Sequence, residues 1–145
     1  MFKKITILII DPERNSCEEM HEFLQKEGFS VLSAFSAAEG KRILEKMPID
    51  ILILDICLPD AIGLDLVKEY KSIYQKMDVI IISGFGDMDS VIQAMRLGTL
   101  DFLRKPLRQN DLRAAIERSQ KIQFADRYIP MQNKKDPRSP LPLPN

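Results

Sequence analysis

Two acids, a hydroxyl and an amine stand at or just after the ends of apolar runs and could act together: Asp11, Asp55, Ser83 and Lys105. Two neighbouring carboxylates repel each other unless a cation joins them, and hard oxygen ligands suit Mg²⁺. A carboxylate can also attack phosphorus and form an aspartyl phosphate. A cation, a lysine and a hydroxyl would then offset charge on the transferring phosphoryl oxygens. The set therefore predicts reversible phosphorylation of one aspartate.

The elements that must position these side chains are five short apolar runs: 5–10, 30–34, 50–54, 78–82 and 99–103. The first, third and fourth runs are rich in Ile, Val and Leu without polar alternation, as in strands buried on both faces of a parallel sheet. The fifth run alternates more and suits an edge strand. Helical patterns with short connections separate the runs, which predicts an α/β fold of (βα)₅ type.

The predicted fold is a flavodoxin-like, doubly wound parallel sheet with strand order 2-1-3-4-5. That order places the first and third strands side by side at the switch point, where ligands bind at the carboxyl ends of strands. Asp11 and Asp55 would then face each other, with Ser83 and Lys105 beyond them. The fold thus brings the four side chains to one edge of the sheet.

The ends of the helices are predicted from capping residues. Pro12 suits the first position of the first helix, where its missing N–H would have no partner in any case. Ser36 opens a capping-box pattern for the second helix, and Gly28 is a suitable stop for the first. The last helix is expected to start at Asn110 or Asp111, both good N-cap residues.

Composition indicates a globular protein with one main domain. The chain has 145 residues, 45% of them apolar and 29% charged, and its formal net charge is zero. This balance does not point to binding of nucleic acid or of an acidic membrane surface. No apolar run approaches the roughly 20 residues that span a bilayer. The first apolar run ends at an acid, unlike a signal peptide, so we expect a cytoplasmic protein.

The chain is expected to divide into a domain at 1–124 and a proline-rich tail or linker at 125–145. Five of the nine prolines fall between Pro130 and Pro144, and apolar periodicity stops there. Such composition is typical of a linker and not of a second packed domain.

Four motifs, in order, carry a resemblance to a known family: "ILIID", "DILILDICLPDAIGLDLV", "IIISGFGDMDSVIQAMRLG" and "DFLRKP". Over about residues 4–124 the chain resembles the response-regulator receiver domains of two-component signalling. The fourth and fifth segments look especially like receivers of the NtrC type. Each motif alone is weak, but together, at the ends of the expected strands, they are highly specific.

The resemblance implies a role for each matching residue of the acidic site. Asp55 would accept the phosphoryl group, and Lys105 would pair with the phosphoryl oxygens. Asp11, Asp55 and the backbone carbonyl of Cys57 would bind Mg²⁺. Ser83 would be the switch hydroxyl that follows the phosphoryl group.

The resemblance also implies a conformational output. Phe102 occupies the position of the rotating aromatic switch residue, and Pro106 would follow a cis peptide bond. Cys57 and Phe85 occupy positions that tune the loss of the phosphoryl group. The expected partners are a histidine kinase and, through the face of the fourth helix, fifth strand and fifth helix, a second receiver or an effector domain. No nucleic acid or membrane is expected to bind this domain directly.

One departure from the family pattern concerns Pro12. The family usually carries a second acid at this position, as a direct metal ligand, and Glu13 is common in the family as well. Mg²⁺ would then bind weakly or through a remodelled set of ligands in which Asp11 or Glu13 moves inward. The alternative is a pseudo-receiver that is never phosphorylated and serves as a protein-interaction module.

Other functions on the same fold are less consistent with the residues. A flavodoxin-like FMN site needs a hydroxyl- and glycine-rich loop after the first strand, and "DPERN" is not one. A haloacid-dehalogenase-type phosphatase needs Asp-x-Asp, whereas this chain has Asp55-x-Cys57. A signalling domain is therefore expected and not an enzyme. Simpler readings also remain open: Asp11 as an N-cap of the first helix, and Phe102 as an ordinary packing residue.

Overall fold

The computed structural model describes residues 4–84 and 88–128. Within these ranges five parallel strands form one sheet of order β2-β1-β3-β4-β5: β1 (Thr6–Ile10), β2 (Ser30–Ala34), β3 (Ile51–Asp55), β4 (Asp78–Ser83) and β5 (Asp101–Arg104). Five helices alternate with them: α1 (Arg14–Lys26), α2 (Ala37–Lys46), α3 (Gly63–Ile73), α4 (Met88–Arg96) and α5 (Gln109–Tyr128). The predicted fold class and strand order are confirmed.

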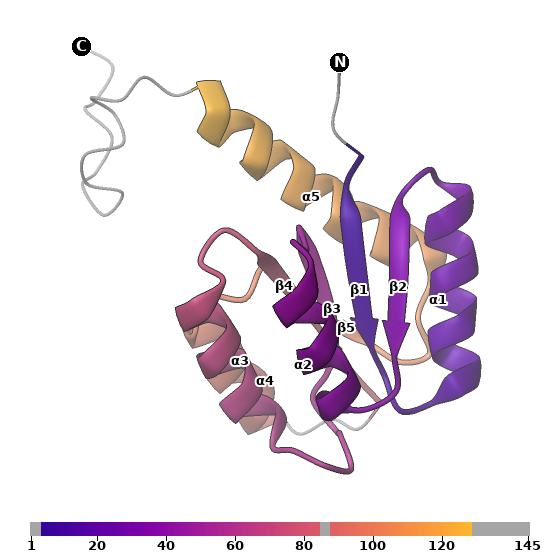
Figure 1. Ribbon diagram of the computed structural model, residues 1–145, viewed down its shortest axis with the longest axis vertical. Coiled ribbons are helices and arrows are strands. Elements are labelled where there is room, and N and C mark those ends of the chain that lie inside the picture. Colours follow the sequence, from indigo (N-terminus) through magenta and orange to yellow (C-terminus); the bar gives the residue numbers. More distant parts are fainter. Residues whose placement is uncertain (1–3, 85–87, 129–145) are drawn as a thin grey trace.

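The sheet is covered on both faces, as Figure 1 shows. Helices α1 and α5 pack on one face, and α2, α3 and α4 pack on the other. Successive residues of β1 point to opposite faces: Leu8 and Ile10 join the core under α2 and α3, whereas Ile7 and Ile9 join the core under α1 and α5. This is why the strand is apolar at every position. Burial of each such side chain contributes about 1.5–3 kcal/mol to the stability of the folded protein.

The register of the sheet brings the two acids together. In the parallel ladder between β1 and β3, Ile10 lies opposite Leu54. Asp11 and Asp55 follow these two residues, so both emerge at the carboxyl edge where the strand order reverses. Ligands of open α/β sheets bind at this edge.

Two of the predicted helix ends agree with the structure. Ser36 is the N-cap of α2, and its hydroxyl accepts a hydrogen bond from the Glu39 N–H at 3.2 Å. Helix α1 ends at Lys26, and Gly28 follows with a φ of +98°, a conformation that favours glycine.

Other predicted boundaries are wrong by one or two residues. Helix α1 begins at Arg14 with Glu13 as its N-cap, so Pro12 precedes the helix and does not open it. Helix α5 begins at Gln109, which places Asn110 and Asp111 inside its first turn. The last strand begins at Asp101 and not at 99, because the Thr99 hydroxyl donates to the carbonyl of Ala94 and holds that residue in the α4–β5 turn.

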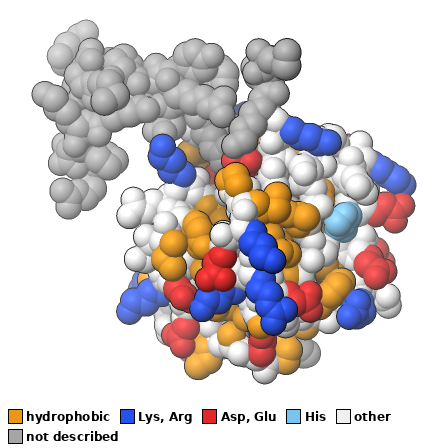
Figure 2. Space-filling model, in the orientation of Figure 1, with side chains coloured by type: hydrophobic (Ala, Val, Ile, Leu, Met, Phe, Trp, Pro, Cys, Tyr) orange, Lys and Arg blue, Asp and Glu red, His pale blue; other side chains and the backbone are white. Residues whose placement is uncertain are grey.

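The C-terminal part of α5 extends past the predicted domain limit at 124, to Tyr128. The rest of the predicted tail and Phe85 lie outside the described residues. No helix in the described ranges is both long and apolar enough to pass through a bilayer. Positive and negative side chains are interspersed on the face drawn in Figure 2.

Candidate functional site

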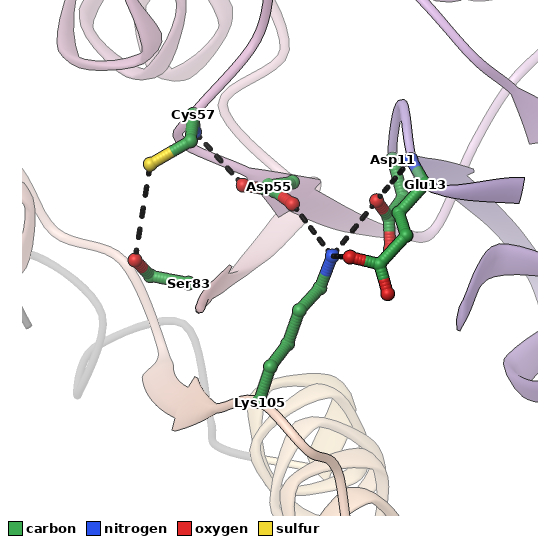
Figure 3. A network of polar contacts seen from close by, with 6 residues as sticks. All are labelled: Asp11, Glu13, Asp55, Cys57, Ser83 and Lys105. Carbon is green, nitrogen blue, oxygen red and sulfur yellow. Dashed lines mark hydrogen bonds and ion pairs between the residues drawn. The ribbon is translucent and has the colours of Figure 1, made fainter. Parts of the chain in front are cut away.

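Lys105 joins the two acids at the carboxyl edge of the sheet (Figure 3). Its Nζ lies 2.9 Å from Oδ1 of Asp11 and 2.8 Å from Oδ2 of Asp55. All three side chains are at least nine-tenths buried. The residues follow or end β5, β1 and β3, and the site exists only because the sheet places these strand ends close together.

The chain around Asp11 is fixed by backbone contacts. The Asp11 N–H donates to the carbonyl of Ala34, which extends the β1–β2 ladder by one residue. The Glu13 N–H donates to Oδ1 of Asp11 at 2.9 Å, forming a turn across Pro12. A proline at this position favours an extended residue before it, which suits Asp11 at the strand end. Asp11 is therefore the acceptor for the N-cap residue of α1 and is not the N-cap itself.

The second carboxylate oxygen of Asp11 takes no part in these contacts. Asp11 is fully buried, and its Oδ2 has no hydrogen-bond partner among the residues the structure describes. A buried carboxylate oxygen without a partner is costly unless a cation or a proton reaches it. This atom is where the structure best fits an additional positive charge.

Asp55 is held at both of its carboxylate oxygens. Oδ1 accepts the Cys57 N–H at 2.8 Å, and Oδ2 accepts from Lys105. Burial raises the pKa of Asp55 above its ordinary value, against the opposing effect of the hydrogen bonds from Lys105 and Cys57, and the charge of Asp11 adds to the rise.

The pKa of Lys105 is also raised. Burial disfavours its charge, but the hydrogen bonds with Asp55 and Asp11 and their charges outweigh that effect. The two raised pKa values thus have different causes: burial for Asp55, and for Lys105 the two carboxylates that its single ammonium serves. The site therefore carries excess negative charge, which favours binding of a further cation.

Glu13 lies at the rim of this group. Its Oε2 is 3.8 Å from Nζ of Lys105, and its side chain is 65% exposed. Its carboxylate therefore faces the same ammonium from the solvent side. A position so exposed allows Glu13 to approach a cation without a cost of burial.

Ser83 and Cys57 form the other side of the site (Figure 3). Ser83 is the last residue of β4 and is almost fully buried, whereas the Cys57 side chain is exposed. The Cys57 Sγ lies 4.0 Å from Oγ of Ser83. The predicted switch hydroxyl therefore stands beside the loop that follows Asp55.

Two other predicted residues lie along β5 and just after it. Phe102 is half-buried and packs against the core on the α2–α3–α4 face of the sheet. The peptide bond between Lys105 and Pro106 is cis. Phe102 is thus in contact with the core and close in sequence to Lys105.

The donor set fits Mg²⁺. The site offers the unpartnered Oδ2 of Asp11 and the carboxylate of Asp55, and the predicted third ligand is the backbone carbonyl of Cys57, whose N–H donates to Asp55. All are the hard oxygen ligands that Mg²⁺ prefers, and this ion commonly keeps several waters. No group of three or more His, Cys, Asp or Glu side chains that could hold a metal ion is found in the described part of the chain.

Asp60 is a residue to which the sequence reasoning gave no role. It lies in the loop between β3 and α3, and its carboxylate accepts the N–H groups of Ala37 at 2.9 Å and Ala38 at 3.1 Å. The available signal was an acid directly after Pro59, a frequent turn pattern. That signal does not reveal that the acid reaches the start of α2, more than twenty residues earlier in the chain.

Comparison with protein families gives a match over most of the described chain. The response regulator receiver domain model matches residues 7–117. Response regulator protein PilR of Pseudomonas aeruginosa is 33% identical over 109 residues, which are 75% of this chain and 24% of PilR. Transcriptional regulatory protein GlrR of Escherichia coli is 30% identical over 115 residues, 79% of this chain and 26% of GlrR.

The chain thus spans about a quarter of each of these regulators. They are regulators of the NtrC type, as the fourth and fifth segments of the sequence indicated. Among solved structures, a receiver domain protein of Clostridium thermocellum aligns with a TM-score of 0.78 at 36% identity, covering 83% of this chain and 98% of that one.

Proposed function

Because this chain belongs to the response regulator receiver domain family, we propose that it accepts a phosphoryl group from a histidine kinase on Asp55. The observation that supports this most directly is the arrangement of Asp55 itself. Its two oxygens are held by the Cys57 N–H and by Lys105, at the carboxyl edge of the sheet. A nucleophile held in this way needs little reorganisation before it reacts.

The chemical step follows from these contacts. A carboxylate oxygen of Asp55 forms a bond to phosphorus as the phosphorus–nitrogen bond of a phosphohistidine breaks, and the electron pair returns to the imidazole nitrogen. Lys105, already 2.8 Å from Asp55, can turn its ammonium toward the transferred phosphoryl oxygens. In Figure 3 the Ser83 hydroxyl lies on the opposite side of Asp55 from the Lys105 ammonium, and it can donate to another of these oxygens. The protein thus contributes position and charge.

Mg²⁺ is proposed to be held by Asp11, Asp55 and the carbonyl of Cys57, with Glu13 as a further ligand from the rim. Bound there, the ion would supply positive charge for the phosphoryl oxygens. The unpartnered Oδ2 of Asp11 supports the proposal.

We propose that phosphorylation changes the conformation of the protein along β4 and β5. Ser83 ends β4 and Phe102 lies in β5, and the two strands are hydrogen-bonded neighbours. A phosphoryl group that draws in the Ser83 hydroxyl would change the packing next to Phe102. Helix α4 also exposes three apolar side chains spaced along one stripe: Met88, Ile92 and Met95. The face of α4, β5 and α5 is therefore suited to binding a second receiver or an effector domain.

Pro12 favours a second candidate, a pseudo-receiver that binds partners without being phosphorylated. Proline offers no side-chain ligand where the family usually has an acid, and Lys105 already neutralises part of the site. In that case Asp11, Asp55 and Lys105 would be a structural ion-pair cluster.

Phosphorylation of the full chain by acetyl phosphate, read by phosphate-affinity gel, decides between the two. We expect Mg²⁺-dependent phosphorylation of the wild type and none of Asp55→Asn. Asp65→Asn, which changes an exposed acid of α3, is the matched control and should behave as the wild type. Absence of phosphorylation of the wild type at saturating Mg²⁺ would support the pseudo-receiver.

A further inference from the structure

The loop after the phosphoacceptor strand is attached to the start of α2. The two oxygens of Asp60 accept the N–H groups of Ala37 and Ala38, the first two residues of that helix. These N–H groups have no partner inside the helix, and the positive end of the helix favours a carboxylate. The contact therefore joins two segments that are far apart in the sequence.

Helix α2 already has its own cap. The Ser36 hydroxyl accepts the Glu39 N–H, a different donor from the two that Asp60 receives. The hydrogen bonds from Ala37 and Ala38 lower the pKa of Asp60 below its ordinary value, so its carboxylate is charged at neutral pH. Asp60 and Ser36 thus accept hydrogen bonds from N–H groups at the same helix end, but only Asp60 attaches the β3–α3 loop to that end.

The loop from Cys57 to Ile62 is short and its two ends are joined. A displacement of Asp60 would therefore also displace Cys57. Cys57 and Ile62 form an isolated antiparallel bridge at the base of the loop. Gly63, directly after it, lies so close to the backbone of Ile56 that a Cβ at this position would overlap the Ile56 carbonyl oxygen. The bridge and this close approach hold the two ends of the loop together.

Cys57 then connects the loop to the phosphoacceptor. Its N–H donates to Oδ1 of Asp55 at 2.8 Å, and its carbonyl is the proposed metal ligand. The orientation of the peptide groups on either side of Cys57 therefore affects both the nucleophile and the cation.

We infer that Asp60 is a positioning residue for phosphoryl transfer: its carboxylate anchors the loop 57–62 to the N-terminus of α2 and so holds Cys57 beside Asp55. This inference rests on the function proposed above. It assigns Asp60 no contact with the phosphoryl group or with Mg²⁺.

The test compares four forms of the full chain: the wild type, Asp60→Ala, Asp60→Asn and Ser36→Ala. We expect Asp60→Ala to lower the rate constant for phosphorylation by acetyl phosphate about tenfold and to raise the Mg²⁺ concentration for half-maximal rate, as loss of a residue that orients a ligand does. Asp60→Asn keeps one accepting oxygen, so its rate constant and Mg²⁺ dependence should lie between those of the wild type and of Asp60→Ala. Ser36→Ala removes a cap from the same helix end and should lower the melting temperature without changing either kinetic value.

Circular dichroism identifies the temperatures at which all four forms are folded, and the phosphorylation rates are compared at those temperatures. Equal rates and equal Mg²⁺ dependence for Asp60→Ala and Ser36→Ala would overturn the inference, because a merely structural cap would then account for Asp60. If the wild type itself is not phosphorylated on Asp55, the proposed function fails, and the role of Asp60 fails with it. The wild-type reaction thus separates the two failures.

Discussion

At the residue scale, Pro12 decides which ligands surround the buried acid of β1. The turn from Asp11 to Glu13 uses Oδ1 of Asp11 as an acceptor and leaves Oδ2 without a partner in the described ranges. An acid at position 12 would add a carboxylate close to this oxygen. In the proposed Mg²⁺ site, the side chain at position 12 would therefore set how many carboxylates the protein offers the ion.

Pro12→Asp is expected to tighten Mg²⁺ binding by about tenfold, because it adds a hard oxygen ligand beside Asp11. Isothermal titration calorimetry measures the affinity. Pro12→Ala is the control, since it frees the same backbone without adding a carboxylate. Equal Mg²⁺ affinity for the two variants would show that position 12 does not contact the ion.

The charge of Asp60 leads to a pH-dependent contribution to stability. Its pKa is lower in the folded protein than the ordinary value of 3.8, chiefly because of the Ala37 N–H and then the Ala38 N–H. The unfolded chain therefore binds this proton more readily. The stabilisation is complete above the unfolded pKa and is lost as the pH falls through the folded pKa.

Asp60→Asn removes this contribution. We expect the wild type to melt higher than Asp60→Asn at about pH 6, and the difference to shrink as the pH falls below about 4. Thermal melts followed by circular dichroism across this range provide the measurement. A difference that stays constant down to about pH 2 would mean that the carboxylate charge is not involved.

At the element scale, the start of α3 combines a tight contact with a missing cap. Ile62 is the N-cap residue, but it makes no side-chain capping bond and is 67% exposed. Gly63, the first residue of the helix, is fixed against Ile56. We therefore expect substitutions at positions 62 and 63 to change the free energy of unfolding in opposite directions.

Gly63→Ala is expected to lower the free energy of unfolding by about 2 kcal/mol, because its methyl group would overlap the Ile56 backbone. Ile62→Ser is expected to raise it by about 1 kcal/mol, since serine can accept an N–H of the first turn. Urea denaturation measures both values. Ile62→Ala is the control for the serine, and an equal gain from alanine would exclude capping as the cause.

At the scale of the whole molecule, both core clusters are assembled from elements that end no later than α5. Among the residues whose burial is described, 4–84 and 88–122, both core clusters end at or before Ile116, and the last buried polar residue is Ser119. Ser119 donates to Asp78 at the start of β4 and ties α5 to the sheet. We therefore propose that the segment after α5 is a linker that the domain does not need for folding.

A chain ending after Tyr128 is expected to melt within about 2 °C of the full chain, because it retains every buried residue of both clusters. A chain ending after Arg113 is the control: it loses Ala115, Ile116 and Ser119, and should not fold stably. Differential scanning calorimetry measures both. A large loss of stability in the chain that ends after Tyr128 would place part of the domain beyond that residue.

Sequence patterns predicted most of this architecture, because buried parallel strands are continuously apolar and the helices between them are amphipathic. The four residues Asp11, Asp55, Ser83 and Lys105 were identified from their places at or after the ends of the apolar runs. The exact ends of elements were less predictable: Pro12 is compatible both with a helix start and with the turn before it, and only the Glu13 N–H to Asp11 contact distinguishes the two.

The sequence by itself determined the fold class, the receiver family and the residue types of the acidic site, since these follow from local periodicity and from motifs within single segments. Only the tertiary structure decided the contacts between segments: Lys105 between two carboxylates, the unpartnered oxygen of Asp11, and Asp60 on the N-terminus of α2. Such contacts depend on the register of neighbouring strands and on how a loop packs against a distant helix. No local pattern encodes those distances, because they result from the packing of the whole sheet and its helices.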